Sequence, residues 1–287
     1  MDTMLVGALV SGSIYALISL GFALAFRISG VFNLAHGIQL IFAAYANYWL
    51  SDSVGLSPLF SVPIAVVATA MLGYLIEARA IPVAKRAGIS KVDLLILSWL
   101  LLIAVQNVLG IVFSNESIYL GRSDVATGIS LWEASVMPLQ IATFCVAICL
   151  GGTTMWFIFR SRSGHSVMAV GDDLRLAMIF GLGVNRILTV NAIFSATLTA
   201  AAGVMLSYQE RIDPGLGFRF SIIAIVATLI GYRLGPGGAI FGGFLLAFLE
   251  AIVLYLVDPG LRNGAVYLCL FITGILAYRR VEIPHDP

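Results

Sequence analysis

Polar side chains that could act inside an apolar environment are concentrated in one short stretch of the chain. Asn33, His36 and Gln39 advance by threes, so on a helix they share one slowly turning side. Amide and imidazole groups placed in this way line a route for polar solutes or support a broken helix. They equally serve to hydrogen-bond neighbouring helices and fix their packing, which is worth about 0.6 kcal/mol per contact in membranes. The sequence leaves both interpretations open.

Glu250 is the other residue that could do chemistry in an apolar setting. It lies within Leu245–Val257, a stretch without any other charge, where an ionised carboxylate is costly unless it is paired or neutral. We therefore expect a partner for Glu250 on another segment or on a second protein, and both a structural and a pathway role stay open. His36 lacks the companions that a metal site or a proton relay needs, so packing or capping is its favoured role.

No catalytic, cofactor or metal site is predicted. The three cysteines lie in apolar runs without a ligand-like spacing to His or acidic residues, which is typical of small buried side chains. The chain has no G-x-x-x-x-G-K-[ST] phosphate loop, no H-E-x-x-H and no G-x-S-x-G. The sequence therefore favours a protein that is not an enzyme and does not hydrolyse ATP itself.

The composition indicates where these residues must lie. Of the 287 residues 60% are hydrophobic and only 11% are charged, whereas a soluble domain carries about 25% charged residues. A net charge of +1 without a basic cluster argues against nucleic acid as a partner. The chain is predicted to be an all-α polytopic membrane protein whose main surroundings are the lipid bilayer.

A bilayer core is crossed by about 20 apolar residues in a helix, and eight or nine such stretches follow one another. The first lacks the features of a cleavable signal, the second is interrupted by polar residues, and the seventh and ninth are short, so broken or re-entrant pieces are expected. Gly238 and Gly242 form a G-x-x-x-G pattern that favours close helix packing. No internal repeat is evident. The predicted spans are Met4–Phe26, Gly30–Leu50, Pro58–Ile76, Leu94–Phe113, Met137–Phe159, Ile187–Tyr208, Phe218–Tyr232, Ala239–Val257 and Gly264–Tyr278.

The basic residues predict the orientation of the chain. One side of the membrane receives 12 of the 16 Lys and Arg residues, and the other side receives most of the acids. Basic loops face the cytoplasm, so we expect the N-terminus outside and the C-terminus inside. The basic side comprises Arg27, the loop 79–91, the loop 160–186, Arg233 and the tail at 279–280.

The loop 160–186 is the one sizeable polar segment outside the predicted spans. Asp172 suits an N-cap, Asp173 suits the positive end of a helix dipole, and Gly181 suits a C-terminal stop, which predicts about two turns of helix between them. Such a short helix needs support from a neighbour. Its apolar side chains either fold back on the membrane helices or, beside Arg175, enter a groove of a cytoplasmic partner; they are Leu174, Leu176, Met178, Ile179 and Phe180.

Three segments give the chain a family resemblance. Asn33-Leu34-Ala35-His36-Gly37 near the second span, Ala177 to Asn185 in the polar loop, and the Gly-rich stretch Gly231 to Gly243 occur in the order found in branched-chain amino-acid ABC transporter permeases. The likeness is to the smaller permease subunit of the high-affinity system and covers nearly the whole chain. Leu34 departs from the usual Phe, and Tyr232, Arg233 and Leu234 depart from the usual Gly-rich pattern.

The resemblance implies a single transmembrane permease domain, 1–287, in the bacterial inner membrane, with 160–186 as its cytoplasmic coupling loop. It implies a second homologous permease, two cytoplasmic ABC ATPase subunits, an extracytoplasmic solute-binding protein and a small amino-acid substrate. Together with the short helix predicted in this loop, the resemblance predicts contacts to the ATPase at Asp173, Arg175, Ala177, Met178, Phe180 and Gly181. The candidate pathway residues are Asn33, His36, Gln39 and Glu250.

Two other functions fit the same residues. Relatives in the resembling family carry urea or short amides, and the two departures from the family pattern bear on the cargo. A secondary transporter coupled to protons or sodium through Glu250 or His36 is the rival from a different class, although ionisable groups are few.

Overall fold

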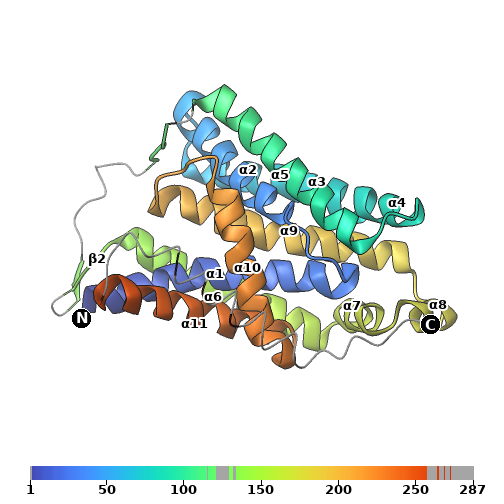
Figure 1. The fold of residues 1–287 in the computed structure, drawn as a ribbon. Helices are drawn as coiled ribbons and strands as arrows, with labels where there is room; N and C mark the ends of the chain where they lie inside the picture. Colours follow the sequence, from blue (N-terminus) through green and yellow to red (C-terminus); the bar gives the residue numbers. More distant parts are fainter. Residues whose placement is uncertain are drawn as a thin grey trace.

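The computed structural model describes residues 2–114, 116–120, 129–131 and 134–256, together with positions 264, 268 and 272. The described part is almost wholly helical, with one short antiparallel pair, β1 (Ile129–Leu131) and β2 (Ala134–Val136). Figure 1 shows most of the helices lying side by side along one direction, whereas α10 (Leu216–Gly231) crosses them steeply. The prediction of an all-α polytopic membrane protein is confirmed.

Six described helices are long and apolar enough to cross a membrane: Met4–Ser29, Pro58–Arg86, Lys91–Phe113, Pro138–Arg160, Val184–Gln209 and Pro236–Tyr255. They correspond to α1 (Asp2–Ser29), α3 (Pro58–Gly73) with its continuation, α5 (Lys91–Phe113), α6 (Pro138–Arg160), α9 (Val184–Gln209) and α11 (Pro236–Leu256). The shorter α10 and a broken second segment account for two more of the predicted spans. The ninth, Gly264–Tyr278, lies almost entirely outside the described residues, so eight or nine spans agree only roughly with the structure.

The second predicted span is broken, as its polar residues suggested. Gly30, in the left-handed region at φ +61°, ends α1, and the chain stays irregular until α2 (His36–Tyr48) begins. Irregular backbone is tolerated at this depth only where protein satisfies its polar groups. Here Ser98 Oγ accepts a hydrogen bond from Leu34 N (3.1 Å), and Ser221 Oγ donates to Leu34 O (3.2 Å). A π-helical turn, Trp49–Ser53, then extends α2.

The third helix also continues beyond its predicted end. A π-helical segment, η2 (Tyr74–Ala80), joins α3 directly to α4 (Ile81–Arg86). The helix therefore carries Glu77 inside the folded chain, although the sequence placed it just after the span that ends at Ile76. This extension provides the central carboxylate of the site described below.

Two units of the same design occur in opposite orientation. The first is α1–α2–α3 and the second is α9–α10–α11. In the first unit the long first helix ends at Ser29 and the second helix begins at His36. In the second unit the corresponding residues are Gln209 and Leu216, and each lies 180 positions later in the sequence. Figure 1 shows that α1 and α9 run in opposite directions. The arrangement is an inverted-topology repeat, as found in several transporter folds.

The irregular links of the two units fold alike. Asn33 Oδ1 accepts a hydrogen bond from Ala35 N at 3.0 Å, and Asp213 Oδ1 accepts one from Gly215 N at 2.8 Å. Both are turns in which a short polar side chain bonds the backbone two residues on, and both stand just before the second helix. The two Asx residues and the two donors are again separated by 180 positions.

The second helices of the two units meet at their first turns. A Cβ on Gly37 would lie 2.1 Å from Gly217 O, and a Cβ on Gly217 would lie 3.0 Å from Gly37 O, so each glycine makes room for the other's backbone. Asn191 Nδ2 donates to Leu24 O at 3.0 Å, which ties the start of α9 to the end of α1. The centre of the molecule is thus a crossing of the two units.

The third helix of each unit packs on the first helix of the other. A Cβ on Gly243 of α11 would lie 2.6 Å from Ala16 N of α1, and a Cβ on Gly73 of α3 would lie 2.2 Å from Ala196 Cβ of α9. The predicted close packing of the G-x-x-x-G pattern is confirmed, since a Cβ on Gly242 would lie 2.0 Å from Ala227 O. The sequence did not reveal the repeat because the two units do not share a pattern of identical side chains. What they share is close backbone contact at small residues.

These contacts place the core around α1, α2, α9 and α10, which supply most of the large buried side chains. By contrast, α3, α5 and α6 expose long apolar faces, as expected for helices that meet lipid or a second membrane subunit. The inner helices therefore position the site, and the outer ones enclose it.

The crossing glycine gives a direct test of this packing. We expect Gly37→Ala to destabilise the protein by about 1–3 kcal/mol, because the added methyl group must displace the backbone of α10. Gly152→Ala is the matched control, since a Cβ at this position of α6 meets no atom within 4 Å. Thermal melting of the detergent-purified protein measures both. Equal melting temperatures for Gly37→Ala and the wild type would contradict the crossing.

Candidate functional site

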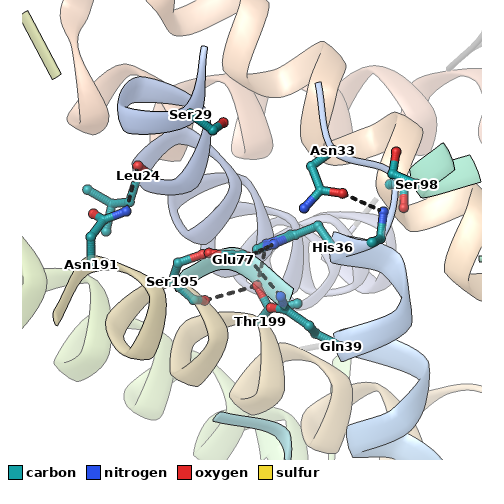
Figure 2. A network of polar contacts seen from close by, with 12 residues as sticks. Leu24, Ser29, Asn33, His36, Gln39, Glu77, Ser98, Asn191, Ser195 and Thr199 are labelled. Carbon is teal, nitrogen blue, oxygen red and sulfur yellow. Dashed lines mark hydrogen bonds and ion pairs between the residues drawn. The ribbon is translucent and has the colours of Figure 1, made fainter. Parts of the chain in front are cut away.

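Glu77 is the centre of a buried polar cluster, and its side chain is only 7% exposed. Its Oε1 atom lies 3.3 Å from His36 Nδ1, accepts a hydrogen bond from Gln39 Nε2 at 2.8 Å, and contacts Ser195 Oγ at 3.5 Å. His36 Nε2 contacts Thr199 Oγ1 on its other side. The cluster joins η2, α2 and α9, as Figure 2 shows.

Asn33 extends this polar region toward a cavity. Its carboxamide oxygen is used by the turn at Ala35, whereas its Nδ2 is buried without a hydrogen-bond partner among the described residues. Asn33 and Glu77 both line a cavity of about 780 Å³ between the end of α1, α4 and the start of α9. Lys85, Arg86 and Arg186 also line it, so its polar wall carries both signs of charge.

Glu250 lies in a second buried cluster, and its side chain is 3% exposed. Arg219 Nη2 donates to Glu250 Oε1 at 3.3 Å, Tyr15 Oη donates to Glu250 Oε2, and Arg219 Nη1 lies 3.6 Å from Glu210 Oε2. The expected partner of Glu250 is therefore in this chain. The arginine also lies over the Phe220 ring, 5.4 Å from its centre.

The polar loop forms two short helices, α7 (Arg162–Asp172) and α8 (Leu174–Ile179). Asp173 caps α8, because its Oδ1 accepts a hydrogen bond from Leu176 N at 2.9 Å. The sequence placed the cap one residue too early: Asp172 instead ends α7 and pairs with Arg27 at 2.6 Å. Gly181 is in the left-handed region at φ +75°, as expected of a residue that ends a helix.

The apolar side chains of α8 divide between two sides: Leu174 and Met178 line the large cavity, whereas Ile179 and Phe180 are turned to the outside. Ile179 and Phe180 are 79% and 76% exposed, and Leu174, Leu176 and Met178 are about half exposed. Ala177 alone is buried, on the side that faces the chain. Arg175 is exposed beside them. Leu174 and Met178 thus face the membrane helices in part, while Leu176, Ile179 and Phe180 stay exposed, so the structure leaves both alternatives for this helix open.

Comparison with known proteins shows which family the chain belongs to. A family model described as "Branched-chain amino acid transport system / permease component" matches residues 4–276. The chain belongs to this family. It is a transmembrane permease subunit of the ABC transporter type, and a transporter subunit rather than an enzyme, as the sequence predicted.

Two similar proteins match this permease over nearly its whole length. The high-affinity branched-chain amino acid permease protein BraD of Pseudomonas aeruginosa is 30% identical over 97% of this chain and 96% of its own length. LivH of Salmonella typhimurium is 25% identical over 94% of both chains. An autoinducer 2 import permease, LsrC of an Enterobacter strain, is 30% identical but covers 68% of this chain and 54% of itself. No solved structure matches the permease significantly.

The structure separates the four candidate pathway residues of the permease. Asn33 lines the large cavity, whereas His36 and Gln39 are fully buried and hold Glu77. Glu250 lies in the other cluster. The polar side predicted for Asn33, His36 and Gln39 exists, and the last two converge on one carboxylate that was not predicted.

Glu77 and Arg219 are two charged residues of these clusters that the sequence interpretation missed. Glu77 directly follows the predicted span that ends at Ile76, and the π-helical continuation that buries it leaves no simple sequence signal. Arg219 had a signal: it lies inside the predicted span Phe218–Tyr232, and an isolated cation there requires an acid. Matching it with the isolated Glu250 would have found the pair.

The structure also bears on what the sequence predicted for the cysteines and for metal binding. Cys145 and Cys149 are exposed on α6 rather than buried, because that helix turns an apolar face outward. No group of three His, Cys, Asp or Glu side chains in the described ranges is placed to hold a metal ion.

The Arg219–Glu250 pair predicts a stability effect. Arg219→Gln should destabilise the permease by about 3–5 kcal/mol, because it leaves a buried carboxylate without its cation. The double variant Arg219→Gln/Glu250→Gln should recover much of this loss, since no uncompensated charge remains between them. Arg211→Gln, at an exposed position, is the control. The melting temperatures of the variants in detergent measure these effects. A double variant no more stable than Arg219→Gln would refute the pairing.

Proposed function

We propose that this permease imports branched-chain or related small amino acids, using ATP hydrolysed by two separate cytoplasmic ATPase subunits. It forms the translocation pathway together with a second homologous permease and receives its cargo from an extracytoplasmic solute-binding protein. The observation that carries the proposal is the exposed apolar surface of α8, a capped helix that stands outside the bundle of a permease of this family.

The orientation of the chain follows from the charges at its two ends. Figure 1 shows α4, α7 and α8 at one end of the molecule, and the N-terminus and β2 at the other. The end with α4, α7 and α8 carries Arg27, Lys85, Arg86, Arg160, Arg162, Arg175 and Arg186. By the preference of basic loops for the cytoplasm, this is the cytoplasmic end, with the N-terminus outside. It is also the end at which an ATPase is available.

The coupling loop connects mechanically to the polar cluster. Residues 160–186 leave α6 and return directly into α9, so a force on α8 acts on the start of that helix. Ser195 and Thr199 of α9 contact Glu77 and His36. A tilt of α9 driven by the ATPase therefore alters the cluster beside the large cavity, while the rest of the single domain 1–287 holds the other helices in place.

Branched-chain cargo is favoured over urea or short amides because the large cavity is mostly apolar. Its wall includes Ile28, Ile81, Met178, Leu182 and Leu188, which suit an aliphatic side chain and give no advantage to a small polar amide. The relatives BraD and LivH, named for branched-chain amino acid transport, agree with this choice. Uptake of labelled leucine and labelled urea by the complete system separates the two cargoes.

The α8 surface gives the test of the proposed coupling. Phe180→Glu and Arg175→Glu should each reduce co-purification of the ATPases and leucine uptake at least tenfold, because a charge is placed in, or reversed beside, an apolar contact. Ser163→Glu, at an exposed position of α7, is the control that adds the same charge nearby. The amount of permease in the membrane should stay constant. Normal assembly and uptake in both α8 variants would contradict the proposal.

A further inference from the structure

The inverted repeat places two buried glutamates in equivalent surroundings. Ser195 contacts Glu77 and Tyr15 contacts Glu250, and these two residues of α9 and α1 are 180 positions apart. Likewise Gln39 donates to Glu77, and Arg219, again 180 positions later, donates to Glu250. Each carboxylate stands on the third helix of its unit and is held by the first helix of the other unit and the second helix of its own.

The two glutamates differ in the charge of their partners. At Glu250 the equivalent position is an arginine, so the carboxylate is neutralised by a permanent cation. At Glu77 the same position is the neutral amide of Gln39, and neither Lys nor Arg contacts the carboxylate within the described residues. An ionised carboxylate at such depth is costly without a counter-charge. The repeat therefore contains one half with a permanent cation and one half in which, among the described residues, only His36 could carry a positive charge next to the carboxylate.

Both glutamates border a cavity, and the cavity at Glu77 is the larger, with about 780 Å³ against about 470 Å³ at Glu250. Glu77 lines the space of about 780 Å³, which lies within the range of about 300–1,000 Å³ typical of small-molecule sites. The three contacts described for Glu77 all use Oε1, which leaves its second oxygen for a further donor. Asn33 Nδ2, also on the wall of this cavity and buried, is a donor without an acceptor among the described residues. A carboxylate whose described contacts use only one of its oxygens and an amide donor without an acceptor thus border the same cavity.

We propose that Glu77 and Asn33 form the subsite that binds the charged ends of an α-amino acid on its way through the permease. The ammonium group of the cargo supplies the cation that Arg219 supplies at Glu250, and the cargo carboxylate accepts a hydrogen bond from Asn33 Nδ2. His36 and Gln39 are positioning residues, because they hold Glu77 at the cavity wall. The assignment rests on the proposed amino-acid cargo and specifies where the chain recognises it.

The comparison of the two glutamates gives a test with an internal control. In proteoliposomes containing the complete transporter, Glu77→Gln should lower leucine uptake per assembled complex at least tenfold, because the amide cannot pair with an ammonium group. Glu250→Gln, the equivalent change in the other unit, should retain uptake within about twofold per assembled complex, because Arg219 keeps Glu210 as its acid and no contact to the cargo is lost. Co-purification with the ATPases measures assembly and separates loss of recognition from loss of folding.

A binding measurement keeps the proposal testable if Glu77→Gln fails to assemble. Labelled leucine is bound to the purified transporter in detergent without the solute-binding protein, and 3-methylbutylamine and 4-methylpentanoate are used as competitors. Asn33→Ala should weaken competition by the carboxylate at least fivefold and leave competition by the amine unchanged. Equal loss for both competitors, or no loss for either, would overturn the role of Asn33.

The outcomes for the subsite and for the cargo are distinguishable. Wild-type leucine uptake together with unchanged uptake in Glu77→Gln would refute the subsite and leave the proposed function standing. A complete wild-type system that takes up urea and no amino acid would refute both. Leucine uptake lost in Glu77→Gln and kept in Glu250→Gln is the result expected.

Discussion

The helix packing of this permease depends on the free-energy cost of burying a carboxylate inside a membrane bundle. Each buried glutamate must be given donors by neighbouring helices, and in doing so it links three of them: Glu77 joins η2, α2 and α9, and Glu250 joins α11, α1 and α10. The two sets interlock where Gly37 and Gly217 cross. The same electrostatic requirement therefore stabilises both units and fixes how they meet.

The two units differ in the charges around their buried glutamates, so the two ends of the bundle are not equivalent. At the N-terminal end of the bundle Glu250, Arg219 and Glu210 form a closed charge network beside Tyr15. Toward the basic end, Glu77 is bonded to neutral or titratable groups and borders a large cavity. The backbone is thus symmetric while the charges are not: Glu250 has a permanent cation beside a cavity of about 470 Å³, and Glu77 has no Lys or Arg partner among the described residues beside the cavity of about 780 Å³.

The sequence predicted the class, most of the helices and the short helix in the polar loop, because these depend on local properties. Hydrophobic length alone indicated Met4–Phe26 and Ile187–Tyr208, and capping chemistry indicated the short helix before Gly181. It did not predict the repeat, the depth of Glu77 or the partner of Glu250. Those depend on the π-helical continuation after α3 and on helix contacts between positions about 180 residues apart, which leave no pattern along one segment.

We propose that an ATPase outside this chain drives transport through it. The direct measurement is leucine accumulation in proteoliposomes that contain both permeases, with the ATPases and ATP on one side, the solute-binding protein on the other, and ionophores that collapse proton and sodium gradients. The account predicts accumulation that requires ATP and the ATPases and persists without any ion gradient. Accumulation that needs an ion gradient and proceeds without the ATPases would contradict it.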